Sequence, residues 1–154
     1  MNIDIISIGK FKKNDPQKEI FENYIKRIKW NINLQELLCK NSTNKNCEID
    51  KEKEGKLLLG HIKHNSKIIL LDERGKNFTS LEFANLLEKH RDNADCLSFI
   101  IGGANGTSDE VKRKAALILS FGAMTFPHLM IRSILAEQIY RSYSIINNHP
   151  YHKI

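Results

Sequence analysis

The sequence predicts a single α/β domain, residues 1–154, built on a mostly parallel sheet with helices on both faces. Two observations lead to this prediction. Short apolar runs of strand length recur along the chain, and each of them is followed by a segment with helical periodicity or a helix-start signal. Strands that alternate with helices form parallel sheets, because each helix carries the chain back across the sheet. A chain of this length can bury a substantial core.

The first half of the chain contains two strand–helix units. The Ile-rich run 3–8 predicts a strand, and segment 16–28 places its apolar residues on one helical face. The run 32–38 predicts a second strand. Residues 41–46 are polar and irregular, so we expect a mobile surface loop there, followed by a helix from about 48 to 64.

The middle of the chain repeats the pattern. The run SKIILLDERGK (66–76) predicts a buried strand that ends in a charged turn. The helix predicted at 79–90 opens with Thr79 and Glu82 at the spacing of a capping box. The apolar run 96–101 predicts the next strand.

The last third again alternates strand and helix. After the loop GGANG, Thr107 and Glu110 have the spacing of a second capping box, which predicts a helix start. The run 117–121 predicts a strand, and 122–128 (GAMTFPH) predicts a turn. A long helix is expected over 129–146, and it is apolar on almost every side.

Composition narrows the class of protein. Twenty-four Lys and Arg against 18 Asp and Glu give a net charge of +6, which favours an anionic partner such as nucleic acid without requiring one. The three cysteines form no CxxC pair, so we expect neither a disulfide framework nor a zinc ribbon. The histidines at 61 and 64 have no third ligand nearby, so no metal site is expected. Without a signal-like or membrane-spanning run, we expect a cytoplasmic protein.

Three loops follow predicted strands and should meet at the carboxyl edge of the sheet, where ligands bind in such folds: DERGK, GGANG and GAMTFPH. GGANG matches neither the GxGxxG fingerprint nor a Walker A loop, so no dinucleotide or nucleoside triphosphate is indicated. Two interpretations of its glycines stay open. They form a tight strand-to-helix turn that uses positive φ, or they bring the backbone close to a flat ligand.

The long helix and the tail after it contain unusual residues. Because a helix that is apolar on most sides is covered on most sides, a second subunit is expected to cover it, giving a homodimer. The polar residues on this helix are costly there unless paired or functional. They are Arg132, Glu137, Gln138 and Arg141. The tail NNHPYHKI gathers groups that donate, accept and stack, which suggests contact with RNA.

The motifs LLDERGK, IIGGANG and LSFGAMTFPHLMIRSILAEQIYRSYSIINNHPYHK, together with IDIISIGK at the start, closely resemble the ribosomal RNA large subunit methyltransferase H (RlmH) family of SPOUT methyltransferases, at nearly full length. The resemblance implies S-adenosylmethionine-dependent methylation at N3 of a pseudouridine in a hairpin loop of large-subunit (23S) ribosomal RNA. By the same resemblance, the substrate is expected to be this RNA within the large subunit or the assembled ribosome. The resemblance also implies a homodimer and a C-terminal trefoil knot.

The resemblance places the cofactor contacts in the three strand-end loops, at Leu71, Gly102, Phe121, Gly122, Ala123, Met124, Thr125 and Phe126. N3 of pseudouridine must lose a proton before it attacks, so the site needs a proton acceptor or a group that stabilises the anion. The candidates are His152, Tyr151, Arg141 and Arg132, and the sequence does not choose the base among them. In the family, the tail is thought to complete the partner's site.

Two other functions compete with this interpretation. One is a basic RNA-binding or ribosome-associated factor of the same fold that performs no transfer. The other is a phosphate-ester enzyme that holds its substrate at GGANG, but the sequence contains no acid or metal site for it.

Overall fold

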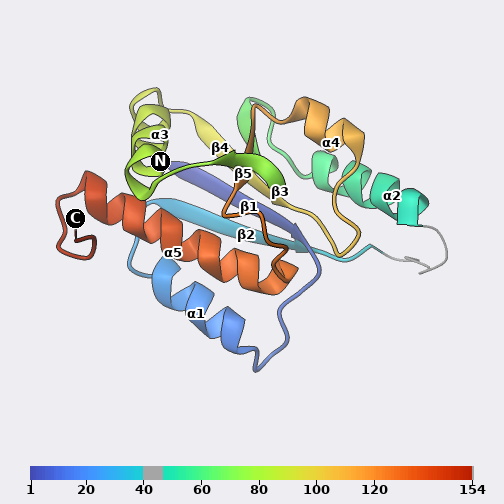
Figure 1. Cartoon of the computed structure of the whole chain (residues 1–154), viewed down its shortest axis with the longest axis horizontal. Helices are drawn as coiled ribbons and strands as arrows, with labels where there is room; N and C mark the ends of the chain where they lie inside the picture. The colour runs from blue at the N-terminus through green and yellow to red at the C-terminus, as the bar shows by residue number, and fades with distance from the viewer. Residues whose placement is uncertain (40–46, 154) are drawn as a thin grey trace.

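The computed structural model describes residues 1–39 and 47–153, so the surface loop predicted at 41–46 lies outside the described residues. Within the described part, five strands alternate with five helices (Figure 1). Their bounds are β1 (Asn2–Ile8), α1 (Pro16–Ile25), β2 (Asn31–Leu37), α2 (Cys47–Gly60), β3 (Ser66–Asn77), α3 (Ser80–Asp92), β4 (Cys96–Ile101), α4 (Asp109–Lys114), β5 (Leu117–Ser120) and α5 (His128–Ile146). The predicted α/β class is confirmed.

All neighbouring strands of the sheet are parallel, in the order β2-β1-β4-β3-β5. Strand β1 lies between β2 and β4, and its residue Ile5 pairs with Leu34 on one side and Phe99 on the other. Side chains alternate across a strand, so both faces of a central strand must be apolar if helices cover both. Ile3 and Ile5 point into one core, and Ile6 and Ile8 point into the other.

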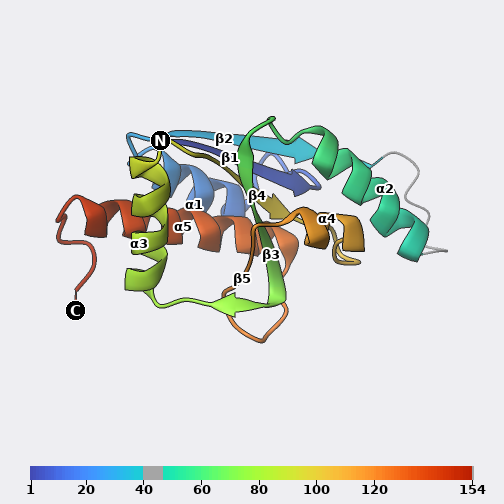
Figure 2. The same ribbon diagram turned by 90° about the horizontal axis from the view of Figure 1, so that it is seen from above.

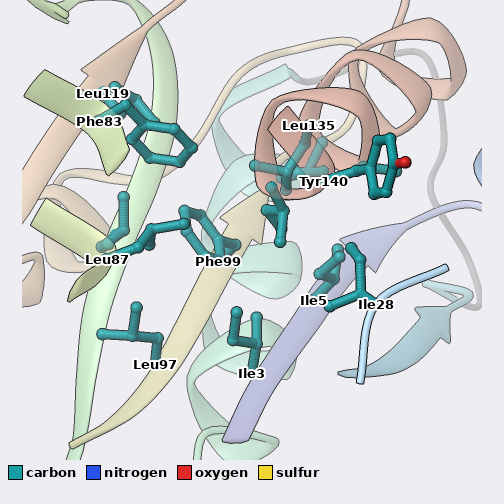
Figure 3. Close-up of a cluster of buried hydrophobic side chains, with 14 of the residues drawn as sticks. Ile3, Ile5, Ile28, Phe83, Leu87, Leu97, Phe99, Leu119, Leu135 and Tyr140 are labelled. Atoms are coloured by element: carbon teal, nitrogen blue, oxygen red, sulfur yellow. The ribbon is translucent and has the colours of Figure 1, made fainter. Parts of the chain in front are cut away.

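The two cores lie on opposite faces of the sheet. The larger core lies beneath α1, α3 and α5 and joins residues from distant parts of the chain, among them Ile3, Phe83, Phe99 and Leu135 (Figure 3). The smaller core lies beneath α2 and α4, where Leu58 packs with residues of β1, β3 and β4. Helices therefore cover both faces, as the alternating pattern predicts.

One of the two predicted capping boxes exists. Oγ1 of Thr79 accepts a hydrogen bond from the Glu82 amide at 3.2 Å, and the Glu82 carboxylate accepts one from the Thr79 amide at 2.7 Å. The second prediction was wrong, because Ser108 is the N-cap of α4 and its side chain makes no capping hydrogen bond. Thr107 instead packs against the glycine loop before it, and Glu110 pairs with Lys114 at 2.8 Å.

The boundaries differ from prediction in three places. Helix α1 ends at Ile25 and not at 28, and α2 ends at Gly60 and not at 64, because turn-type hydrogen bonds continue the apolar pattern beyond each helix. The charged turn predicted at the end of the third strand lies within β3. There the pairing with β5 changes register between Leu71 and Lys76, so the intervening residues form an irregularity in a continuous strand.

Candidate functional site

A cavity of about 660 Å³ opens at the carboxyl ends of β3, β4 and β5. The segment DERGK within β3 and the loops that follow β4 and β5 line it, so the three stretches that the sequence singled out do meet in one place. Pockets of roughly 300–1,000 Å³ accommodate small-molecule ligands and cofactors. The residues 101–107 form one wall, 119–128 form another, and 71–74 lie between them.

The structure brings most of the predicted cofactor residues together. The cavity is lined by Leu71, Gly102, Phe121, Gly122, Met124, Thr125 and Phe126. Ala123 belongs to the same loop, but it is exposed and is not among the lining residues. Met124 is also 74% exposed at the rim, so it contributes to the opening of the cavity and not to its floor.

The glycine loop after β4 owes its composition to the protein's own packing. A Cβ at Gly102 would lie 2.6 Å from the methyl carbon of Thr107, and one at Gly103 would lie 2.7 Å from the Glu54 carboxylate. Gly106 has φ +80°, which is typical of a turn residue. Both interpretations of GGANG are therefore partly right: Gly106 makes the turn, and Gly102 and Gly103 allow close approach, but to other residues of the chain.

The loop after β5 is tied to the irregular part of β3. Oγ of Ser120 accepts the Gly122 amide at 3.0 Å and donates to the Gly122 carbonyl at 2.8 Å, which closes a tight turn at φ +138° for Gly122. The Thr125 hydroxyl donates to the carboxylate of Glu73. The Thr125–Glu73 contact therefore fixes the loop after β5 against the segment of β3 that also lines the cavity.

His128 is a pocket residue that the sequence reasoning did not single out. It is the first residue of α5 and lines the cavity next to Pro127. Burial lowers the pKa of His128, and the nearby Arg132 charge lowers it further. The ring is therefore held neutral and can accept a hydrogen bond. The Pro-His pair at a predicted helix start was the available signal, since proline is common there.

Arg132 lies inside the fold, one turn further along α5. Its side chain is 0% exposed and donates to the Glu36 carboxylate at 3.0 Å and to the carbonyl oxygen of Ile8 at 2.6 Å. Burial lowers the pKa of Arg132, and the Glu36 charge opposes that effect. Arg132 is not among the residues that line the cavity.

The other three catalytic candidates form a cluster around Glu137, which we call the tail cluster (Glu137, Arg141, Tyr151 and His152). Arg141 donates to the Glu137 carboxylate at 2.5 Å, and its second terminal nitrogen lies 3.2 Å from Nδ1 of His152. Tyr151 donates to the same carboxylate at 3.0 Å. Glu137 and Arg141 are therefore paired, which is one of the two alternatives that the sequence left open.

The tail cluster is electrostatically linked. Burial raises the pKa of Tyr151, and its hydrogen bonds with Tyr24 and Glu137 raise it further, so the phenol keeps its proton. Burial lowers the pKa of Arg141, but the hydrogen bond and charge of Glu137 outweigh this and raise it overall. Tyr151 also packs edge-on against Tyr140 of α5 at 4.7 Å between ring centres, which holds the tail against this helix.

The C-terminal tail and the loop after β5, which lines the cavity, lie at opposite ends of α5 (Figures 1 and 2). Ile131, near the start of the helix, lines the cavity, whereas Glu137 is the first residue of the cluster along α5 and Arg141 follows one turn later. At about 1.5 Å of rise per residue, Glu137 is roughly 9 Å and Arg141 roughly 15 Å from Ile131 along the helix axis. Within one chain, the predicted cofactor residues and the tail residues therefore do not meet.

Basic side chains stand around the cavity. Lys51 of α2, Arg74 of β3 and Lys112 of α4 all contribute to its lining. Lys112 lies 3.7 Å from Asp109 on an exposed helix turn, so its charge remains open to solvent. Among the described residues there is no group of three metal-binding side chains, and no described helix has both the length and the apolarity to cross a membrane.

Comparisons with known proteins agree with this geometry. The family described as "Predicted SPOUT methyltransferase" matches residues 1–152. The chain is 43% identical to "Ribosomal RNA large subunit methyltransferase H" of Clostridium botulinum (strain Kyoto / Type A2), over 99% of this chain and 100% of that protein. It is 38% identical to the protein of the same name from Paramagnetospirillum magneticum, over 99% of each chain.

A solved structure resembles the fold. A probable methylase family protein from Haemophilus influenzae Rd KW20 aligns with a TM-score of 0.57 at 13% identity, covering 99% of this chain and 71% of that one. At this level of identity the likeness concerns the fold alone.

Proposed function

The chain belongs to the SPOUT methyltransferase family, and on that premise we propose that it transfers a methyl group from S-adenosylmethionine to N3 of a pseudouridine in a hairpin loop of large-subunit (23S) ribosomal RNA. The observation that carries the proposal is the single cavity built from the three strand-end loops. We also propose the family's C-terminal trefoil knot and a cytoplasmic location, which rest on the family membership.

The residues of the cavity fit the proposed cofactor. Leu71, Phe121 and Phe126 provide apolar walls for an adenine ring, and the backbone of the glycine loop provides hydrogen-bonding groups beside them. The side chain of Ser120 is already used within its own turn, so polar contacts from this loop would come from main chain. When bound, S-adenosylmethionine supplies a methyl group on a positively charged sulfur.

The reaction requires little covalent chemistry from the protein. The bond from N3 to the methyl carbon forms as the bond from sulfur to that carbon breaks, and the N3 proton passes to a base. Catalysis therefore depends on alignment and on stabilising the N3 anion. Because Tyr151 keeps its proton and donates to Glu137, it suits hydrogen bonding to the target base and not proton acceptance. The acceptors in the tail cluster are Glu137 and His152.

The separation of cavity and tail cluster supports a homodimer with shared sites. Met130, Ile134 and Ile145 follow one another along the outward face of α5 and belong to neither core. Gln138 and Arg141 lie on the same stripe. We propose that two copies pack these stripes together, so that the tail cluster of one subunit reaches the cavity of the other.

The direct test is a transfer assay. Purified protein is mixed with S-adenosylmethionine carrying a labelled methyl group and with ribosomal particles that lack the modification, and digested nucleosides are identified by mass spectrometry. We expect labelled N3-methylpseudouridine. Particles with uridine at the target position are the control, because they separate recognition of pseudouridine from recognition of the loop. Label at another nucleotide would overturn the proposed specificity.

The rival RNA-binding factor predicts a different result in the same assay. Such a protein would bind the particles and leave them unlabelled, whether or not it bound the cofactor. The well-formed cavity weighs against it, since a pure RNA-binding factor has no need of a deep pocket at the strand ends.

A further inference from the structure

Helix α2 contacts the glycine loop through a buried polar surface. Asp50 and Glu54, one turn apart on α2, are both buried, and so are Thr107 and Ser108 at the far end of the loop. Buried carboxylates are uncommon unless they are paired or functional. This contact lies directly behind the wall of the cavity formed by residues 102–107.

The helix and the loop approach each other more closely than side chains normally permit. A Cβ at Gly103 would lie 2.7 Å and 3.1 Å from the two carboxylate oxygens of Glu54. A Cβ at Gly55, the next residue of α2, would lie 2.2 Å from the Ser108 hydroxyl. The Glu54 carboxylate therefore lies against the loop backbone, at a distance that only glycine permits at position 103.

The electrostatics of this contact raise the pKa of Glu54 above its ordinary value. Burial raises the pKa of Glu54, the Asp50 charge raises it further, and the backbone N–H of Gly103 opposes both effects. The other charges near this contact are Lys51, which pairs with Glu48 on α2, and Lys112 and Asp109, which pair with each other on α4.

Several oxygen atoms of the contact have no hydrogen-bond partner in the structure, namely Oε2 of Glu54, Oγ1 of Thr107 and Oγ of Ser108. Leaving a buried polar atom without a partner costs about 1–3 kcal/mol. Unsatisfied groups of this kind persist where the surrounding structure needs the geometry they hold. Here the three oxygen atoms lie where α2 meets the glycine loop.

We infer that Glu54 is a positioning residue for the cofactor site: its carboxyl group, packed against Gly103 and accepting the Gly103 N–H, holds the backbone of residues 102–107 in the conformation that binds S-adenosylmethionine. This inference rests on the proposed function. It assigns no contact with the cofactor to Glu54, which acts only through the loop.

The test uses two substitutions at this position and one control. Glu54→Ala removes the group that supports Gly103, and we expect cofactor affinity to fall on the order of tenfold by calorimetry, matching the loss of one buried hydrogen-bonding group. Glu54→Gln keeps the shape and remains neutral, so affinity should stay within about threefold of wild type. Glu52→Ala, on the exposed side of α2, should leave affinity unchanged.

Two further readouts separate positioning from general stability. In the absence of cofactor, hydrogen exchange at the amides of 103–107 should accelerate in Glu54→Ala and not in Glu54→Gln, while exchange in β1 stays the same. The second readout is thermal unfolding without cofactor, which shows how much stability Glu54→Ala loses independently of cofactor binding.

The outcomes are distinguishable. If wild-type protein does not bind S-adenosylmethionine, the proposed function fails, and the exchange experiment still tests whether Glu54 holds the loop. If wild type binds and Glu54→Ala binds equally well with unchanged loop exchange, the inference is overturned. Should Glu54→Ala fail to fold, Glu54→Leu replaces it, because leucine keeps side-chain bulk and cannot accept the Gly103 N–H; wild-type affinity and loop exchange in that variant would contradict the inference.

Discussion

The guanidinium of Arg132 lies 3.0 Å from the carboxylate of Glu36, although 96 residues separate them in sequence. Because Arg132 also donates to the carbonyl oxygens of Ile8 and Gly9, it joins the start of α5 to the carboxyl ends of β1 and β2. His128, one turn earlier on the same helix, lines the cavity. The ion pair therefore fixes the helix that forms one rim of the site.

Arg132→Gln should destabilise the fold. The substitution removes the guanidinium and leaves the Glu36 carboxylate without its ion-pair partner, and the carbonyl oxygens of Ile8 and Gly9 lose their charged donor. Breaking a buried ion pair in this way costs about 3–5 kcal/mol. Urea denaturation followed by circular dichroism measures the loss. The control Arg113→Gln changes an exposed arginine and should stay within about 0.5 kcal/mol of wild type. Wild-type stability together with lost activity would point instead to a purely catalytic role for Arg132.

Gly102→Ala should deform the glycine loop and weaken cofactor binding, because the new methyl group would lie 2.6 Å from the Thr107 methyl carbon. Overpacking of this kind costs about 1–3 kcal/mol. Gly60→Ala is the matched control, since nothing lies within 4 Å of a Cβ there, and alanine in a helix should be neutral or stabilising. Calorimetry and thermal unfolding compare the two. Equal cofactor affinity in both variants would refute the explanation.

His128 should make stability depend on pH in the mildly acidic range. Its pKa is lowered in the folded protein, so below about pH 6.5 the unfolded chain binds a proton that the folded chain does not. As the pH is lowered below this value, the free energy of unfolding should decrease until the folded ring also becomes protonated. His128→Asn should remove this component, and His64→Asn, at an exposed position, should retain it. Identical slopes for all three proteins would contradict the effect.

Light scattering should give about twice the chain mass of 17.8 kDa for the wild-type protein. Ile134→Glu should shift the protein towards monomer, because it places a charge in the proposed interface between two α5 helices. The control is Ile20→Glu, which changes an exposed apolar residue of α1 and should leave the mass unchanged. A stable wild-type monomer at micromolar concentration would remove the dimer from the proposal.

Deleting residues 149–154 should abolish methyl transfer while cofactor affinity stays near that of the full chain, because the tail cluster is remote from the cavity within one subunit. The measurement pairs calorimetry with the transfer assay.

Purified heterodimers then decide which site the tail serves. One wild-type chain is combined with one chain that carries both the tail deletion and Gly102→Val. A tail that acts across the dimer leaves the only good cavity without a tail, so no activity is expected. Near half of wild-type activity would mean that each tail serves its own subunit.

The sequence predicted the elements where the evidence was local, and it was wrong where packing overrode local signals. Thr79 and Glu82 form their capping box, as their spacing predicts, and both side chains are exposed. Thr107 has the same spacing to Glu110, but its side chain packs against Gly102, a contact that spacing does not reveal. The clustering of Tyr151 with Glu137 likewise depends on how the tail folds back along α5.

The candidate site was likewise predicted only in part from the sequence. The three strand-end loops could be placed at one edge of the sheet, since parallel strands end together. His128 and Glu54 were not found, because their importance comes from burial and from neighbours on other elements. A single histidine or glutamate in a sequence carries no sign of either.

The strand order has a consequence for synthesis of the chain. Strand β1 pairs with β2 soon after both are made, but its other edge pairs with β4, which is translated much later: Asn2 faces Cys96. At about 5–20 residues per second, the Ile-rich edge of β1 stays open for several seconds on the ribosome. An open apolar edge is a site for wrong pairing between chains. The nascent protein should therefore be most prone to aggregation, and most dependent on chaperones, just before β4 emerges.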